Sequence, residues 1–233
     1  KDDTLYDLGS GDGLLVMTAS KLHGATGVGI ELEPALVEMA RNVASVEDVQ
    51  GRVQFVHGDL FEANLSGASV VTLYLLPRFV TRLVPKLRAE LAPGSRIVSH
   101  DYPLSPWQPD KTLTFDVAEK EAITGSTRTT LYYYVVPARL NGTWILSVPK
   151  ALSPTPLTLR VSQGPDQLEG VAEIGGDAVP MRDIFVRADS IRFGLFHRGR
   201  FMQFQGKVTG RELSGEVRSQ NLLERWSARL VKD

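Results

Sequence analysis

The feature that most constrains the fold is a short apolar segment that runs into a glycine-rich turn and then into a helical pattern. Residues 4–8 form a strand pattern, Gly9, Gly11 and Gly13 alternate directly after it, and a helical pattern covers residues 11–22. Glycines let the backbone approach a ligand closely, and the amide-rich end of the helix points at the same place. This stretch therefore predicts a nucleotide-like ligand at the end of the first strand.

Strands and helices alternate along the chain up to about residue 101. Strand patterns cover residues 26–31, 53–57, 69–76 and 94–101, and helical patterns cover residues 34–43 and 78–91. In the second of these helices we expect an interruption near Pro85, because proline fits the start of a helix better than its interior. The alternation predicts an α/β fold with a Rossmann-like, doubly wound parallel sheet. In the helix after the glycine turn, helical spacing relates Leu14, Leu15, Ala19 and Leu22.

Several polar residues end these strands, where doubly wound sheets bind their ligands. We expect them to line one crevice: Asp7, Glu31, Asp59, the segment 74–77 and the segment 99–101. Their spacing distinguishes between cofactors. A dinucleotide fingerprint requires glycine where Leu14 stands, and a P-loop requires Gly-Lys-Ser or Gly-Lys-Thr after the turn, which this sequence lacks.

The remaining pattern has an acid before the glycines, an acid at the end of the second strand and Gly-Asp after the third. It resembles the S-adenosylmethionine site of class I (seven-β-strand) methyltransferases over residues 1 to about 138. The resemblance implies that the three glycines pass under the methionine and ribose parts of the cofactor. It implies that Asp7 lies near the amino-acid end or braces the loop, that Glu31 accepts both ribose hydroxyls, and that Asp59 and Leu60 flank the adenine.

Three further segments narrow the resemblance: Tyr-Leu-Leu-Pro at 74–77, Ser-His-Asp at 99–101, and Trp107 with Pro-Asp-Lys at 109–111. They resemble the protein-lysine methyltransferases related to the mitochondrial enzymes that modify the ATP synthase c-subunit and the adenine nucleotide translocase. In that family a segment ahead of the first strand, with a proline-threonine motif, helps to close the cofactor site. The 233 residues begin after the position where that segment would stand.

An amine acceptor must lose a proton before it attacks the methyl group, so we searched the crevice for groups that hold amines or take protons. The candidates are Tyr74, His100 and Asp101. A carboxylate or carbonyl could hold the amine while water or His100 takes the proton. The alternatives are a purely structural His-Asp pair and a tyrosine buried in the core. We interpret His23 and His57 as structural and expect no metal site.

Composition excludes several other functions. The chain has a formal net charge of -1 and no cysteine, and its halves are similarly balanced, with 14 basic and 17 acidic residues in 1–150 against 12 and 10 in 151–233. We therefore expect no nucleic-acid partner and no thiol chemistry. No apolar run is long enough to span a bilayer. We favour a cytoplasmic location over an exported one, and the sequence does not define the oligomeric state.

From Lys111 the pattern changes to antiparallel, and after Pro137 the helical signals stop. Residues 112–117 and 129–136 form the last two strand patterns of the first sheet, and we expect Tyr132, Tyr133 and Tyr134 to pack the following domain. Short alternating runs separated by glycine turns then predict an antiparallel meander that forms a small closed or half-closed barrel. The predicted domains are 1–138, which binds S-adenosylmethionine, and 139–233, which is β-rich, with Ser-Pro-Thr-Pro at 153–156 as a stiff linker.

Two functions of different classes follow. The first is methyl transfer from S-adenosylmethionine, to a protein lysine or, as a runner-up, to a small molecule or another protein nucleophile. The second is a non-catalytic, cofactor-binding assembly protein whose β-rich tail is an interaction module.

Overall fold

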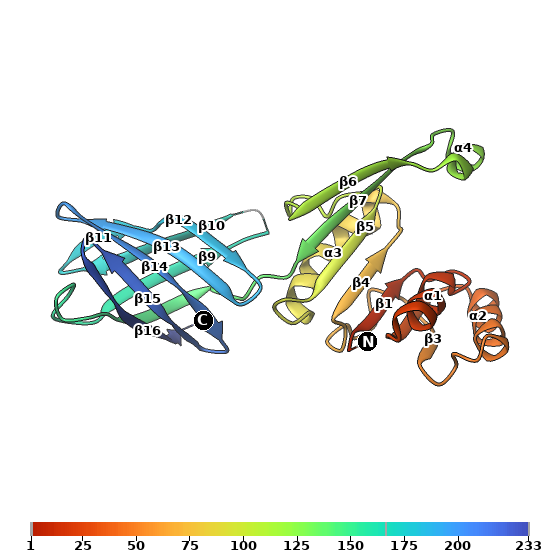
Figure 1. Ribbon diagram of the computed structural model, residues 1–233, viewed down its shortest axis with the longest axis horizontal. Coiled ribbons are helices and arrows are strands. Elements are labelled where there is room, and N and C mark those ends of the chain that lie inside the picture. Colours follow the sequence, from red (N-terminus) through yellow and green to blue (C-terminus); the bar gives the residue numbers. More distant parts are fainter. Residues whose placement is uncertain (1, 166, 233) are drawn as a thin grey trace. The chain divides into compact units, whose positions relative to one another are not determined.

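The computed structural model describes residues 2–165 and 167–232 and forms two compact units, Lys1–Val136 and Pro137–Asp233 (Figure 1). The division falls two residues before the boundary expected from the sequence. In the described ranges, no helix is both long and apolar enough to cross a membrane.

The first unit is a seven-stranded sheet flanked by helices, as the alternation of elements predicts (Figure 1). Its strands follow the order β3-β2-β1-β4-β5-β7-β6, in which β1 to β5 pair in parallel and β7 is antiparallel to both neighbours. The strands are β1 (Thr4–Leu8), β2 (Thr26–Glu31), β3 (Val53–His57), β4 (Val70–Leu73), β5 (Arg96–His100), β6 (Lys111–Asp116) and β7 (Arg128–Val135). The helices are α1 (Leu14–His23), α2 (Pro34–Val46), α3 (Pro77–Glu90) and α4 (Ala118–Thr124).

Helix α1 buries a different face from the one that its leucines indicate. Val16, Met17 and Ser20 are buried, whereas Leu14 and Leu22 are 65% and 72% exposed. The reason lies on β2, where a side chain at Gly27 would overlap Val16. The missing side chain lets α1 approach the sheet through its smaller residues, and its leucines face away.

Helix α3 runs through Pro85 without the interruption expected from the sequence. Proline removes one backbone hydrogen bond from a helix interior. Pro85 is exposed, so the carbonyl that loses its partner faces water. Val84 and Leu87, on either side of it, are buried and hold the helix against the sheet.

Tyr132 and Tyr134 of β7 pack against the core of the first unit, whereas we expected them to pack against the following domain. Tyr134 is fully buried, and its hydroxyl oxygen accepts a hydrogen bond from the Leu104 N–H at 2.8 Å. Its ring centroid lies 5.3 Å from that of Trp107. Tyr134 of β7 and Trp107 therefore form an aromatic pair in the core beside β5.

The second unit is a nearly closed antiparallel barrel, as predicted, with the strand order β11-β10-β9-β8-β16-β15-β14-β13-β12 (Figure 1). The Met181 N–H donates to the Gly170 carbonyl at 2.8 Å and continues the pairing of β10 with β11. The strands are β8 (Gly142–Ser147), β9 (Leu157–Gln163), β10 (Leu168–Ile174), β11 (Asp177–Pro180), β12 (Arg182–Arg187), β13 (Ser190–His197), β14 (Arg200–Thr209), β15 (Glu212–Ser219) and β16 (Leu222–Lys232). The sequence did not predict β11.

Residues 153–156 are not a linker between domains. They connect β8 to β9 inside the barrel, and Ser153 is buried with its hydroxyl donating to the Thr155 carbonyl at 2.7 Å. The prolines stiffen a turn of the barrel. Large side chains fill the barrel interior: the rings of Phe193 and Phe204 stack at 4.6 Å, and Trp226 packs edge-on against both.

Candidate active site

The polar strand ends predicted to share a crevice do lie at one edge of the first sheet. Leu8 pairs with Ile30 on one side and with Leu73 on the other. Leu73 pairs in turn with Ser99. The carboxyl ends of β1, β2, β4 and β5 are therefore neighbours, and the turns that follow them meet at the same edge.

The glycine turn after β1 has a left-handed backbone that glycine adopts readily. Gly9, Gly11 and Gly13 have φ angles of 82°, 54° and 81°. The N–H groups of Gly9 and Ser10 both donate to the Ile30 carbonyl, at 2.8 and 3.1 Å, and hold the turn against β2. The conformation of the turn is thus fixed from β2 by two backbone hydrogen bonds.

The three glycines differ in what surrounds them. A Cβ at Gly13 would overlap the ring of Phe55 on β3, so this glycine makes room for a neighbouring side chain. A Cβ at Gly9 would come 2.8 Å from Leu75. At Gly11, by contrast, nothing in the described chain lies within 4 Å of the Cβ position. Gly11 therefore marks the open side of the turn.

Glu31, at the end of β2, is tied to the glycine turn. Its Oε2 accepts from the Gly11 N–H at 2.9 Å, and its Oε1 accepts from the N–H groups of Leu32 and Glu33 at 2.8 and 3.0 Å. A carboxylate has about four acceptor positions. Binding both hydroxyls of a ribose would therefore require Glu31 to exchange at least one backbone partner for a hydroxyl.

Asp7 lies below the turn and is buried. Its Oδ1 accepts from the Thr72 hydroxyl at 2.6 Å. Burial raises the pKa of this carboxyl to about 6, and the negative charge of Glu31 adds to the rise. The hydrogen bond from Thr72 acts in the opposite direction and lowers the pKa. The hydrogen bond from Thr72 to Asp7 therefore joins β4 to β1 directly before the turn.

Asp59 and Leu60 follow β3 at the far side of the same edge. Asp59 is exposed, and its Oδ1 accepts from the Phe61 N–H at 2.8 Å, so it closes its own turn. Leu60 is half-buried against the first unit's core. Their place is compatible with the predicted contact with adenine.

The predicted acceptor residues lie at the other end of the edge. Tyr74 follows β4, is 54% exposed, and its ring centroid lies 4.1 Å from that of His100 at the end of β5. Tyr74 is thus not a core residue. His100 and Asp101 do not form a hydrogen-bonded pair, because His100 Nε2 and Asp101 Oδ2 are 3.7 Å apart.

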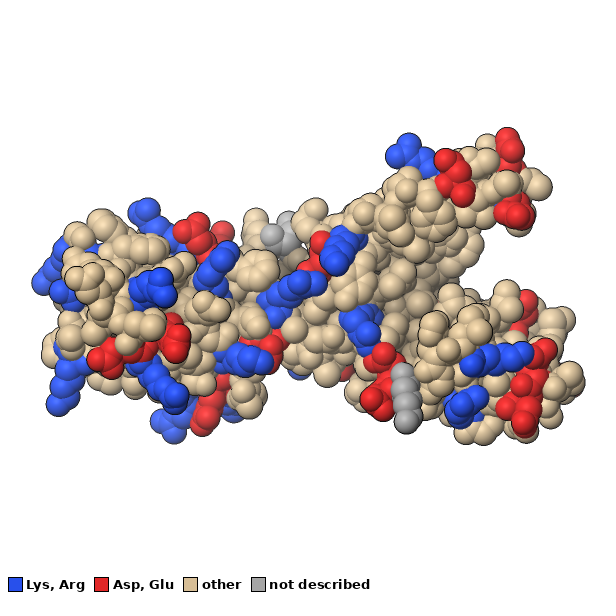
Figure 2. Space-filling model, in the orientation of Figure 1, with Lys and Arg blue, Asp and Glu red and all other residues tan. Residues whose placement is uncertain are grey.

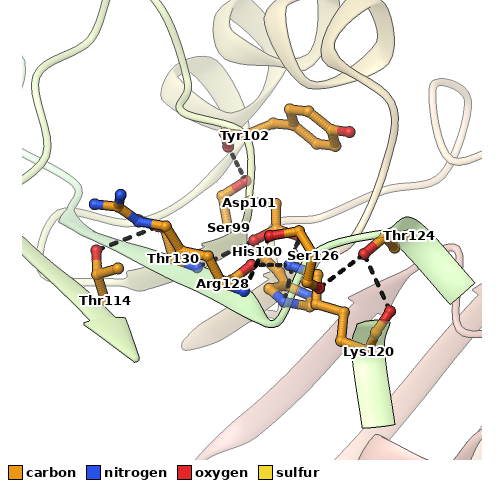
Figure 3. A network of polar contacts seen from close by, with 10 residues as sticks. All are labelled: Ser99, His100, Asp101, Tyr102, Thr114, Lys120, Thr124, Ser126, Arg128 and Thr130. Atoms are coloured by element: carbon orange, nitrogen blue, oxygen red, sulfur yellow. Dashed lines mark hydrogen bonds and ion pairs between the residues drawn. The ribbon is translucent and has the colours of Figure 1, made fainter. Parts of the chain in front are cut away.

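Asp101 instead binds a lysine that the sequence did not single out (Figure 3). The Lys120 Nζ, from α4, donates to Asp101 Oδ2 and to the Arg128 carbonyl, both at 2.5 Å. Asp101 Oδ1 accepts from the Thr130 N–H at 3.0 Å. Asp101 has a φ of 62°, which is uncommon for a residue other than glycine, and these contacts hold it there.

Burial and neighbouring charges shift the pKa values of His100 and Asp101. Burial lowers the pKa of His100 below its usual value of 6.5, and the ammonium of Lys120 lowers it further while Asp101 raises it. Burial alone would raise the pKa of Asp101, but the hydrogen bonds from Lys120 and Thr130 bring it below its usual value. At neutral pH the imidazole of His100 is therefore neutral and the side chain of Asp101 is a carboxylate.

Sequence reasoning missed three members of the site: Thr72, Lys120 and the Arg128 carbonyl. Thr72 could have been found, because it stands in β4 two residues before Tyr74, and the order of the sheet places it beside Asp7. Lys120 gave no signal, since α4 has only seven residues and none of them is buried.

The site opens into a hollow within the first unit. Figure 2 shows it between the projecting end of the β6-α4-β7 hairpin and the part that holds α1 and α2. The residues fit S-adenosylmethionine on two observations: the open backbone at Gly11, and a carboxylate, Glu31, at the position where vicinal hydroxyls need an acceptor.

The chain is similar to known methyltransferases. The family model for the ANTKMT methyltransferase domain matches residues 7–111. A protein-lysine N-methyltransferase of Saccharolobus islandicus is 36% identical over 137 residues, which cover 58% of this chain and 81% of that protein. The human lysine N-methyltransferase of the ATP synthase c-subunit is 38% identical over 107 residues, and the match spans 46% of each chain.

Among solved structures, an RNA methyltransferase from Salinibacter ruber in complex with S-adenosyl-L-homocysteine is 46% identical. It superposes with a TM-score of 0.53 and covers 59% of this chain and 83% of that one. The fold and the cofactor site thus define a class I methyltransferase that uses S-adenosylmethionine. Within that class, the chain belongs to the family of the Saccharolobus protein-lysine N-methyltransferase.

Proposed function

We propose that this enzyme transfers the methyl group of S-adenosylmethionine to the ε-amine of a protein lysine. The observation that carries the proposal is that the acceptor end of the site already holds a lysine ammonium, that of Lys120, between the Asp101 carboxylate and the Arg128 carbonyl. The names of the Saccharolobus and human relatives support the same acceptor.

Different residues of the site would orient the amine and take its proton in such a transfer. When bound, S-adenosylmethionine supplies an electrophilic methyl group on a sulfonium. The Asp101 carboxylate and the Arg128 carbonyl orient the incoming ammonium, which supplies much of the rate in a reaction that depends on alignment. The neutral His100 takes the proton at Nε2, a buried atom with no hydrogen-bond partner in the described chain, and the amine can then attack.

RNA is a second candidate acceptor, because the Salinibacter relative is described as an RNA methyltransferase. The charge of the site argues against it. In the turns after β1, β2 and β3, every charged residue is acidic: Asp12, Glu33, Asp59 and Glu62. These carboxylates repel a phosphate backbone and attract a lysine-rich segment.

A labelling experiment separates the acceptors. The enzyme is incubated with methyl-labelled S-adenosylmethionine and a cell lysate, and the products are divided and treated with protease or with nuclease. We expect label in protein that only protease releases. Label that nuclease releases would favour RNA, label in the low-molecular-weight fraction would favour a small molecule, and no label with bound cofactor would favour an assembly protein.

Glu31→Ala is the control in this experiment. Loss of a charged acceptor should weaken cofactor binding by roughly 2 to 3 kcal/mol. Calorimetry measures this loss, and labelling should fall with it. Glu33→Ala is the matched variant, because the Glu33 side chain is exposed and only its N–H contacts Glu31.

A further inference from the structure

Helix α4 reaches the active site through one side chain. Its other residues, including Ile123 at 85% exposure, face solvent. The Lys120 side chain is 12% exposed and runs back toward the end of β5, as Figure 3 shows. A charged side chain is rarely this well covered unless its ammonium is bound.

The surroundings of the Lys120 ammonium are those that a substrate amine requires. Asp101 Oδ2 and the Arg128 carbonyl each accept one hydrogen bond from Nζ. His100 Nε2 lies 3.7 Å from the same carboxylate oxygen, buried and without a partner among the described residues. The ring of Tyr74 covers the His100 ring. A carboxylate and a carbonyl thus hold one amine, and an unpartnered imidazole nitrogen lies beside the same carboxylate.

We infer that Lys120 is itself a methylation site, modified by the chain that carries it. The inference rests on the proposed function, because it assigns Lys120 as an internal occupant of the acceptor position. The ammonium gives one proton to His100 Nε2, and the nitrogen lone pair then forms a bond to the methyl carbon. The carbon–sulfur bond breaks, the sulfur leaves with the electron pair as S-adenosylhomocysteine, and Lys120 becomes a methylammonium.

The test uses the purified full chain with S-adenosylmethionine and no other protein. Digestion and mass spectrometry should find a methyl group on the Lys120 peptide, at a rate per molecule that does not depend on protein concentration. Lys120→Arg should remove this methyl group. Lys111→Arg, which changes an exposed lysine of the same hairpin, should leave it in place.

A second readout needs no cofactor. With an amine-acetylating reagent, Lys120 of the unmodified chain should react several-fold more slowly than Lys111, because its ammonium is held. Equal reactivity of the two lysines would overturn the inference. Lys120 without a methyl group, in a preparation that methylates lysine in a lysate protein, would also overturn it while the proposed function stands. Absence of lysine methylation in both the chain and the lysate would contradict the proposed function itself.

Discussion

Single residues in the turn after β1 have separate tasks, although their glycines look alike in the sequence. Gly13 makes room for Phe55, whereas Gly11 faces open space beside the Glu31 carboxylate. The alternation of glycines predicted the turn, because positive φ angles follow from residue type. It could not predict which glycine packs against protein, because that depends on a side chain two strands away.

Replacing these two glycines by alanine should separate stability from cofactor binding. Gly13→Ala should lower the free energy of unfolding by roughly 2 to 4 kcal/mol, from the left-handed backbone and the overlap with Phe55. Gly11→Ala should cost about 1 to 2 kcal/mol from the backbone alone but should weaken cofactor binding. Urea unfolding and calorimetry measure the two effects. Equal losses of stability would contradict the distinct roles.

Asp7 should make the stability of the first unit depend on pH. Its pKa in the folded chain, about 6, lies above the ordinary value of 3.8. The folded state therefore favours the protonated carboxyl. The stability that protonation provides is fully present below pH 3.8 and is lost as the pH rises to about 6. The loss amounts to about 3 kcal/mol. Unfolding free energies of the wild type and Asp7→Asn should diverge between pH 4 and about 6, whereas parallel curves would refute the shift.

At the scale of elements, the parallel part of the first sheet was predictable because apolar residues are spaced differently along strands and along helices. The prediction was wrong where tertiary packing overrides the local pattern. α3 continues through Pro85 because buried Val84 and Leu87 hold it, and α1 turns its leucines outward because Gly27 admits Val16. Tyr74 and His100, predicted to act on the methyl acceptor, stand at strand ends and could be found from the sequence. Lys120, in a helix without an apolar face, could not.

The hairpin that carries α4 should depend on Lys120 for its order. Lys120→Ala removes the ammonium that joins α4 to Asp101 and to the Arg128 carbonyl. Hydrogen exchange of residues 118–124 should then accelerate while β1 to β5 keep their protection. Lys111→Ala is the matched control in the same hairpin. Unchanged exchange in α4 would show that other contacts hold it.

At the scale of the whole molecule, the described residues form three hydrophobic clusters, two in the first unit and one in the second. The residues proposed for the cofactor and the acceptor all belong to the first unit. The second unit was recognisable from its alternating runs and glycine turns. The strand β11 was not, because it has only four residues and is defined by its pairing with β10.

A core substitution in the barrel should leave cofactor binding intact. Trp226 is 3% exposed and packs against Phe193 and Phe204, so Trp226→Ala should destabilise the barrel by about 3 to 5 kcal/mol. Thermal unfolding followed by calorimetry should show a lower transition temperature with unchanged affinity for S-adenosylhomocysteine at low temperature. A parallel loss of affinity would show that the cofactor site needs an intact barrel.

The most direct test of the enzyme's chemistry is the identity of the atom that receives the methyl group. Protein labelled from S-adenosylmethionine in a lysate is hydrolysed in acid, and the labelled amino acid is separated by chromatography. A lysine acceptor predicts label in methylated lysine, with little label when the enzyme carries Glu31→Ala. Label in methylated arginine or histidine, or in nucleosides of the RNA fraction, would contradict it.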